Sequence, residues 1–362
     1  MIGRGIRLAR KIARNARAVR DVSLSADAAL TGDDLVFHIV KRLRYRELLA
    51  VANIFALGGY RVRFLVSGPD AIRKLLWYDL TSFCKIPGLT FATRLPSTNS
   101  AISIATDSES ASLVGRDWKR VYRVNFDIPS FRTNSGVLLP YPMHPNIYLQ
   151  YRDHERLEQY RGHKKAIRVL FAGNVGGGYG RGKLFDSISM LSRGEVVDHI
   201  VSRHLARVVR SADELASLIE AAGRSEFVLV DGAHCKIDQR LWLETVARCD
   251  FLLCLPGVVM PMCHAPVEAM AVGTVPLLNY PDWFIPPLEP ARQCLAFSTL
   301  EGLESGLHRA LQMDEQQMGA MRQAALDYYA ENLDPARVFA RLRSLPDREI
   351  VLNHYSDAYT DG

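Results

Sequence analysis

Residues suited to chemistry gather in the stretch 249–278. An apolar run ends in Cys254-Leu255-Pro256-Gly257, and the pattern then predicts a short helix at 266–272, with Pro266 near its first position and Gly273 just past its end. The free N–H groups and positive dipole end of such a helix attract anions, so a diphosphate fits there. Glu268 is expected in the first turn, where its carboxylate can accept hydrogen bonds from two ribose hydroxyls.

A glycine-rich loop follows a second apolar run, at 167–171. The loop begins around Gly173 and ends at Lys183, and it contains Arg181. Glycines let the backbone approach phosphate, and the two cations can neutralise a departing diphosphate. A Walker loop is excluded because Leu184 stands where Ser or Thr would bind Mg²⁺, and the loop contains no GxGxxG. The alternative interpretation is a flexible surface loop.

An alternating β/α pattern must position these residues. Short β-rich runs alternate with helical stretches in both halves of the chain, which argues for βαβ units with parallel sheets. The predicted strands are 35–40, 60–66, 102–105, 121–126, 136–139, 167–171, 226–230, 251–255 and 275–278, and the predicted helices are 47–57, 266–272, 300–312 and 316–332. Because ligands of open α/β sheets bind beyond the carboxyl ends of the strands, we expect two Rossmann-like domains facing a central cleft.

The domain boundary is expected between residues 150 and 165. Prolines at 140, 142 and 145 break any regular element, and a charged, polar stretch from Tyr151 to Lys165 follows them. The predicted organisation is a helix at 1–20, a first Rossmann-like domain at 21–150, a second at 165–325, and a helical segment at 326–362 that can cross back to the first domain.

Composition excludes several classes of protein. With 48% hydrophobic residues, the 362-residue chain can bury a sizeable core, and its length fits two domains. No run approaches the roughly 18–20 apolar residues of a membrane span, and no secretory signal follows the N-terminus, so the cytoplasm is expected. The six cysteines lack zinc-ligand spacing, so neither a metal site nor a disulfide framework is predicted.

The net charge of +6 is concentrated at the N-terminus. Residues 1–20 hold seven arginines and lysines and no acid, which leaves the rest of the chain at −1 and argues against a nucleic-acid partner. On a helical wheel this segment has an apolar stripe and a basic face, the pattern of a helix lying on the inner, anionic face of a membrane. A frayed tail and a targeting peptide are the alternatives. Removal of residues 1–20 is expected to leave a folded protein.

The stretch 250–280 resembles the donor-binding segment of GT-B-fold glycosyltransferases, and most of all that of the exostosin-like families. Their pattern is a strand ending in Cys-Leu-x-Pro, then a loop, then Glu-Ala-x-x-x-Gly-x-x-Pro. The matching residues are Cys254, Leu255, Glu268, Ala269, Gly273 and Pro276. The resemblance is weaker at 167–183 and 281–297, and the first 150 residues show none.

This resemblance implies a C-terminal domain that holds a nucleotide-sugar donor, with Glu268 on the ribose and no catalytic metal or separate cofactor. Many relatives carry a second glutamate eight residues earlier or an arginine three residues earlier, where this chain has Met260 and Ala265. His264 and Arg292 are therefore the candidates for the missing phosphate contacts. His264 has an alternative role as a residue that caps or packs at the loop.

The resemblance also implies that the N-terminal domain binds the acceptor and, in inverting members, supplies the base. Asp107, just past a predicted strand, is our candidate, and Asp127 and His38 are alternatives. The function expected is transfer of a sugar to a glycan or lipid-linked glycan, as in surface polysaccharide or lipopolysaccharide synthesis. A sugar-nucleotide epimerase and a non-catalytic nucleotide- or carbohydrate-binding subunit of the same fold remain alternatives.

Overall fold

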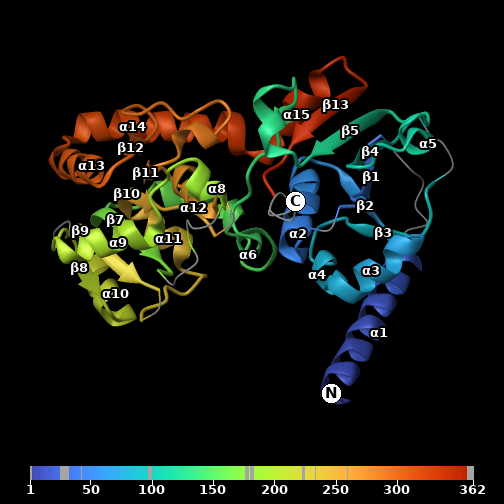
Figure 1. Ribbon diagram of the computed structural model, residues 1–362, viewed down its shortest axis with the longest axis horizontal. Helices are drawn as coiled ribbons and strands as arrows, with labels where there is room; N and C mark the ends of the chain where they lie inside the picture. Colours follow the sequence, from blue (N-terminus) through green and yellow to red (C-terminus); the bar gives the residue numbers. More distant parts are fainter. Residues whose placement is uncertain are drawn as a thin grey trace. The chain divides into compact units, whose positions relative to one another are not determined.

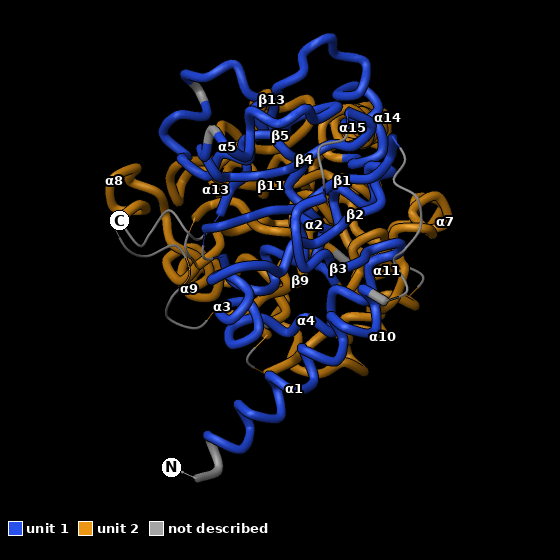
Figure 2. The backbone as a smooth tube through the Cα atoms, turned by 90° about the vertical axis from the view of Figure 1, so that its right-hand side faces the viewer, with its two compact units in different colours: residues 1–145, 334–362 blue, residues 146–333 orange. Residues whose placement is uncertain are grey.

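The chain folds into two compact units. The computed structural model describes residues 2–24, 32–41, 43–96, 100–175, 179, 183–221, 225–232, 234–258 and 260–356. Unit 1 comprises Met1–Pro145 and Asp334–Gly362, and unit 2 comprises Asn146–Leu333 (Figure 2). By this division the chain passes into unit 2 after Pro145, a few residues before the boundary expected between 150 and 165. Pro145 begins a helix instead of breaking one, because a first-turn residue needs no amide N–H for helical hydrogen bonding.

Unit 1 is built on a seven-stranded parallel sheet (Figure 1). In spatial order its strands are β3 (Thr90–Ala92), β2 (Arg61–Leu65), β1 (Asp34–His38), β4 (Ser103–Thr106), β5 (Arg120–Asn125), β13 (Glu349–Asn353) and β6 (Val137–Leu138). Its helices are α1 (Ile2–Leu24), α2 (Tyr45–Leu57), α3 (Pro69–Trp77), α4 (Leu80–Phe83), α5 (Ala111–Val114), η1 (Ile128–Arg132) and α15 (Pro335–Ser344). The strand order reverses between β1 and β4, which makes their carboxyl ends the switch point of this sheet.

The C-terminal segment completes unit 1. Phe339 of α15 packs its ring 5.0 Å from that of Phe55, 5.8 Å from Tyr60 and 6.0 Å from Tyr122. The segment predicted as helical from residue 326 instead divides between the units, because 326–333 stays in unit 2 and Glu349–Asn353 forms a strand between β5 and β6.

Unit 2 is built on a six-stranded parallel sheet in the order β12 (Leu295–Ala296), β11 (Val275–Leu278), β10 (Cys249–Cys254), β7 (Ile167–Gly173), β9 (Ser225–Asp231) and β8 (Arg207–Val209). Its helices are α6 (Pro145–Leu149), η2 (Asp153–Arg156), α7 (Leu157–Arg161), α8 (Lys183–Ser187), α9 (Arg193–Ser202), α10 (Ala212–Glu220), α11 (Trp242–Ala247), α12 (His264–Ala271), η3 (Pro281–Trp283), α13 (Leu300–Gln312), α14 (Glu315–Tyr328) and the π-helical turn η4 (Tyr329–Leu333).

Both sheets confirm the predicted pair of Rossmann-like α/β domains. All six residues of β10 are buried, as expected for a central strand covered by helices on both faces. In unit 2 the strand order reverses between β7 and β10. The ends of these two strands are therefore the switch point where a ligand of this sheet is expected.

Candidate functional site

The two stretches singled out in the sequence meet at the switch point of unit 2. Strands β7 and β10 pair in parallel, with Val169 opposite Phe251, so the loops that follow Gly173 and Cys254 leave the sheet at the same edge. α12 begins after the second of these loops. The N-terminus of α12 and the start of the glycine-rich loop thus lie on one edge of one sheet.

Arg193, which the sequence did not single out, ties the two loops together. It is the first residue of α9, after the N-cap Ser192, and its side chain is half-buried. Its Nη1 donates to the carbonyl of Asn174 at 3.0 Å, and its Nη2 donates to the carbonyls of Leu255 at 3.1 Å and Pro256 at 2.9 Å. The guanidinium therefore fixes the backbone just beyond β7 against the backbone just beyond β10.

The three bonds of Arg193 use only its two terminal nitrogens. Its Nε is buried and has no hydrogen-bond partner among the described residues. The guanidinium carbon also lies 4.0 Å from the ring centroid of Tyr179, in the glycine-rich loop. A fixed guanidinium at the switch point adds positive charge where a phosphate is expected to bind. Arg193 stands ten residues beyond the glycine-rich loop and belongs to no motif, so the sequence gives no signal of this role.

The helix start and Glu268 differ from their predicted positions. α12 begins at His264, two residues earlier than expected, so Pro266 is its third residue and Glu268 its fifth, in the second turn. Pro266 fits there because the first-turn amides have no partner within the helix. Glu268 is 3% exposed, and its Oε2 accepts a hydrogen bond of 2.6 Å from Nε1 of Trp242 on α11.

The other predicted donor-site residues near α12 lie at the ends of the helix, in the loop before it or at the end of β7. His264 is half-buried at the helix N-terminus. Gly257 allows a tight loop, since a Cβ there would lie 2.7 Å from the carbonyl oxygen of Met260. Gly273 follows the helix with a φ of 71°, which favours glycine and confirms the predicted helix end. Gly173 is the last residue of β7.

Two cysteines lie at this edge, Cys254 at the end of β10 and Cys263 at the start of α12. Cys263, the N-cap of α12, contacts the hydroxyl of Tyr280 at 3.3 Å and the carbonyl of Leu255 at 3.7 Å. Burial raises the pKa of the Cys263 thiol, and it raises that of the Cys254 thiol as well. A raised pKa favours the neutral thiol, which is a weaker nucleophile than the thiolate.

Arg292 lies away from the start of α12. Its Nη1 pairs with both carboxylate oxygens of Glu289, at 2.8 and 2.9 Å, and its side chain is 62% exposed. It also interacts electrostatically with Asp327 of α14. The neighbouring Leu326 lies beside Gly273, at the C-terminal end of α12. The structure thus does not bring Arg292 to the helix N-terminus.

The structure describes the position of only one of the two cations predicted in the glycine-rich loop. Arg181 lies outside the described residues. Lys183 is the first residue of α8, which begins ten residues after the end of β7 by chain numbering. Their roles toward a diphosphate stay predictions.

Asp107 holds a loop of unit 1 in place. It follows β4, and its two carboxylate oxygens accept hydrogen bonds from the backbone N–H groups of Val40 at 2.6 Å and Lys41 at 2.7 Å, just past β1. This contact joins the loops that follow β1 and β4 at the switch point of the unit 1 sheet. It gives Asp107 a structural role, and its role as catalytic base stays a prediction.

His38 and Lys74 form the titratable part of the same edge. Nδ1 of His38 lies 3.1 Å from the Thr106 hydroxyl. Nζ of Lys74 lies 2.6 Å from Asp70 and donates to the carbonyl of Leu65 at 3.2 Å. Burial and the nearby Lys74 lower the pKa of His38, and burial lowers that of Lys74 despite Asp70. A half-buried, neutral imidazole at a switch point can accept a proton.

One cavity of unit 2 lies elsewhere. It has a volume of about 650 Å³ and is lined by residues that include Lys165, Ala221 and Arg248, which stand just before β7, β9 and β10. It therefore opens at the amino edge of the sheet, opposite the switch point. Within the described ranges, no three His, Cys, Asp or Glu side chains converge as metal ligands would.

Comparison with known proteins gives distant structural likenesses only. No family model matches the chain. No curated protein matches it. Similar solved structures include a glycosyltransferase from Rickettsia africae, with 9% identity, a TM-score of 0.43, and 86% of this chain and 99% of that one covered. HepE from Anabaena in complex with UDP and glucose has 14% identity and a TM-score of 0.41, and MurG from Acinetobacter baumannii has 12% and 0.41; each alignment covers 86% of this chain and 99% of the other.

Proposed function

We propose that the chain is a GT-B-type glycosyltransferase whose unit 2 binds a nucleotide-sugar donor. The observation that supports this most is the edge formed by the ends of β7 and β10, where Arg193 joins both loops beside the start of α12. First-turn amides, a fixed guanidinium and a loop with further cations suit a diphosphate. The match of residues 250–280 to the exostosin-like pattern is the sequence support for the sugar-nucleotide class.

The proposed reaction transfers the sugar to a glycan or lipid-linked glycan bound by unit 1. An acceptor hydroxyl oxygen attacks the anomeric carbon, the bond from that carbon to the phosphate oxygen breaks, and the nucleoside diphosphate leaves with the bonding electrons. Arg193, Lys183 and Arg181 stabilise the negative charge that develops on the leaving group. In an inverting mechanism, His38 or Asp107 accepts the hydroxyl proton. No metal is assigned a role.

The first test is a thermal-shift screen with UDP, GDP and CMP and their sugars, each with and without a chelator. We expect one nucleotide family to raise the melting temperature, and the chelator to leave that shift unchanged. No stabilisation by any of them would contradict the proposal for unit 2. A shift that the chelator abolishes would contradict only the proposal that donor binding needs no metal.

Arg193→Met tests whether the arginine that joins the loops after β7 and β10 supports nucleotide binding. Loss of three charge-assisted hydrogen bonds should free both loops, and the dissociation constant of the stabilising nucleotide should rise at least about tenfold by calorimetry. Arg203→Met, at the other end of α9 in an exposed pair with Glu304, is the matched control. Equal affinity in both variants would remove Arg193 from the site.

A non-catalytic binding subunit is the second candidate. It is favoured by Met260 and Ala265, which replace charged residues of the resembling pattern. Slow hydrolysis of the sugar nucleotide that stabilises the chain would exclude this candidate. Tight binding without hydrolysis or transfer to any glycan acceptor would support it.

A further inference from the structure

The N-terminal helix is anchored to unit 1 by its second half. Asn15 is fully buried, and its Nδ2 donates to the carbonyls of Leu75 at 3.1 Å and Tyr78 at 2.7 Å. Val19 is 9% exposed, and the Ser23 hydroxyl donates to the carbonyl of Phe91 at 2.8 Å. Figures 1 and 2 show that the first half of α1 extends beyond the rest of unit 1. The second half of the helix is thus packed against unit 1.

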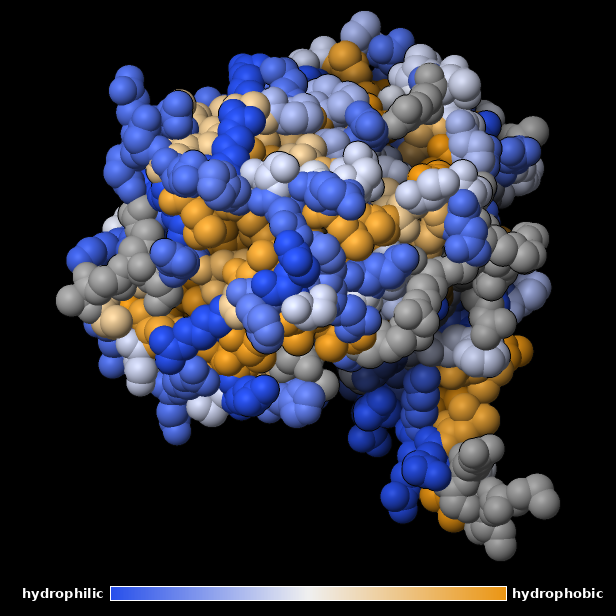
Figure 3. All heavy atoms as spheres, turned by 60° about the vertical axis from the view of Figure 1, so that its left-hand side comes forward, coloured by the Kyte–Doolittle hydropathy of each residue, from blue (hydrophilic) through white to orange (hydrophobic). Residues whose placement is uncertain are grey.

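The extending half of α1 exposes both charge and apolar surface. Arg7 and Arg10 are exposed, and so are Ile6 at 49% and Leu8 at 44%. In Figure 3 hydrophilic and hydrophobic residues occupy opposite sides of this helix. A helix with an exposed apolar side and an arginine-rich opposite side has the arrangement of helices that lie in a membrane interface.

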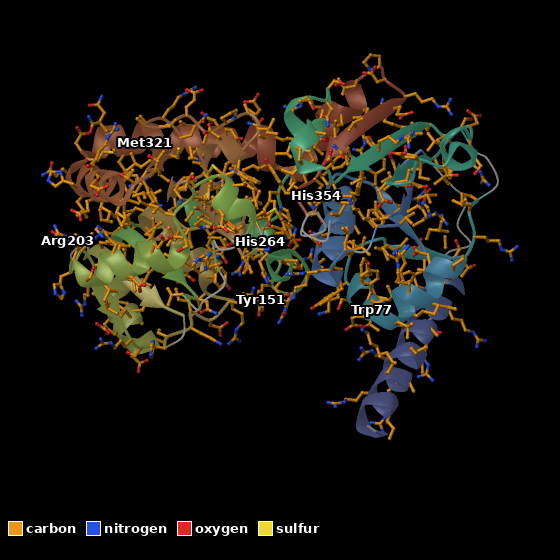
Figure 4. All side chains as sticks on the ribbon, viewed as in Figure 1. Trp77, Tyr151, Arg203, His264, Met321 and His354 are labelled. Carbon is orange, nitrogen blue, oxygen red and sulfur yellow. The ribbon has the colours of Figure 1, made fainter. Side chains whose placement is uncertain are left out.

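An exposed tryptophan stands beside this helix. Trp77, the last residue of α3, is 55% exposed, and its carbonyl accepts a hydrogen bond of 3.1 Å from Nζ of Lys11 (Figure 4). Arg14 pairs with Asp79 at 3.3 Å, two residues further on. The end of α3 therefore lies against the basic side of α1. Ile72 of α3 is 67% exposed, so α3 adds two large apolar side chains to this part of unit 1.

We propose that an anionic lipid surface binds to the α1–α3 surface, which we define as Ile6, Arg7, Leu8, Arg10, Ile72 and Trp77. Tryptophan is favoured at the level of lipid headgroups because its ring is apolar while its N–H needs a polar partner. The arginines face the anionic headgroups, and the aliphatic side chains enter the outer acyl region. No helix within the described residues is long and apolar enough to span a membrane.

The chemistry favours lipid over nucleic acid. The phosphates of a nucleic acid bind arginines but offer no apolar surroundings for Ile6, Leu8 and Ile72. A lipid interface accommodates both the charged and the apolar side chains. The charge is also local, because outside residues 1–20 the chain carries −1. This proposal concerns unit 1 and is independent of the proposed donor site in unit 2.

Co-sedimentation of the full chain with phosphatidylglycerol and phosphatidylcholine vesicles tests the proposal. We expect binding to phosphatidylglycerol only, weakened at high salt. Arg7→Glu/Arg10→Glu should reduce that binding by about tenfold or more. Each basic residue near an anionic surface contributes a binding free energy equivalent to roughly a severalfold change in affinity. Arg337→Glu/Arg341→Glu, an equal charge change at exposed positions of α15, should leave it unchanged.

Insertion is tested separately with brominated phosphatidylglycerol, which quenches tryptophans that reach the interface. The full chain should be quenched, and Trp77→Phe should lose most of that quenching. Trp77→Ala/Ile72→Ser should bind vesicles several-fold more weakly, and Val201→Ala, at an exposed position of α9, should not. The proposal fails if charge reversal at Arg7 and Arg10 has no more effect than its control, if Trp77 is not quenched, or if an oligonucleotide binds while phosphatidylglycerol vesicles do not.

Discussion

At the scale of single residues, Glu268 has two roles to distinguish. Its carboxylate is buried and accepts the indole N–H of Trp242, so it joins α11 to α12 whether or not a ribose binds. Glu268→Gln keeps the size and one acceptor oxygen but removes the charge. If the carboxylate binds ribose hydroxyls, nucleotide affinity should fall at least about tenfold, because charge-assisted hydrogen bonds contribute roughly 1.5–3 kcal/mol.

The matched variant is Trp242→Phe. It leaves the charge of Glu268 in place and removes its indole donor, so we expect a loss of stability of roughly 1–3 kcal/mol. Calorimetry with the stabilising nucleotide and thermal unfolding should be measured on both variants. Unchanged affinity in Glu268→Gln would leave the residue with its structural role alone.

His354 should make the stability of unit 1 depend on pH. Burial lowers its pKa from 6.5 to about 4, and its Nδ1 has no hydrogen-bond partner among the described residues. Below pH 6.5 the unfolded chain therefore binds a proton that the folded unit does not. Stability is unaffected above that pH and falls as the pH drops toward 4. The expected loss between pH 7 and 5 is roughly 2 kcal/mol.

His354→Phe should remove this part of the pH dependence, since the ring stays apolar and can keep its edge-to-face contact with Phe126. Hydrogen exchange of the β5 and β13 amides at pH 7 and 5 reports on unit 1 specifically. His308→Phe, at an exposed position of α13 in unit 2, is the control. An identical pH dependence in the wild type and His354→Phe would contradict the assignment.

At the scale of elements, α1 packs against unit 1 with its second half and carries part of the proposed lipid-binding surface on its first half. Deletion of residues 1–20 was expected to leave the fold intact, but that cut removes the buried Asn15 and Val19 and uncovers the surfaces of α3, α4 and β3 that they contact. We expect this deletion to lower the melting temperature of unit 1 by roughly 5–10 °C. Deletion of residues 1–10 should lower it much less.

Asn15→Ala provides the matched point substitution. It removes the two hydrogen bonds to Leu75 and Tyr78 without touching the basic half of α1, so it should lower stability while leaving vesicle binding unchanged. Equal melting temperatures for the full chain and the chain lacking residues 1–20 would show that α1 does not stabilise unit 1.

At the scale of the whole molecule, the chain order makes the two units unequal. Unit 2 is one continuous segment, whereas unit 1 is interrupted by it and needs β13 between β5 and β6. We expect the fragment 146–333 to fold cooperatively on its own. The fragment 1–145 should not, because it lacks β13 and the buried ring of Phe339.

Circular dichroism and thermal unfolding of the two fragments check this expectation, and co-expression of 1–145 with 334–362 is the control for unit 1. A cooperative transition in 1–145 alone would show that the C-terminal segment is not required for the fold of unit 1.

The sequence by itself determined the alternation of strands and helices, the bounds of β11 and α13, and the strand, loop and helix of residues 249–273. These depend on local signals, namely apolar runs and the positions of proline and glycine. Tertiary structure decided the short strands β3, β8, β12 and β13, which are defined by their neighbours in the sheet. It also decided that Arg193 reaches two loops about eighty residues apart along the chain, that Asp107 holds the loop after β1, and that the second half of α1 packs against unit 1. Such contacts join residues distant along the chain, and no local pattern encodes them.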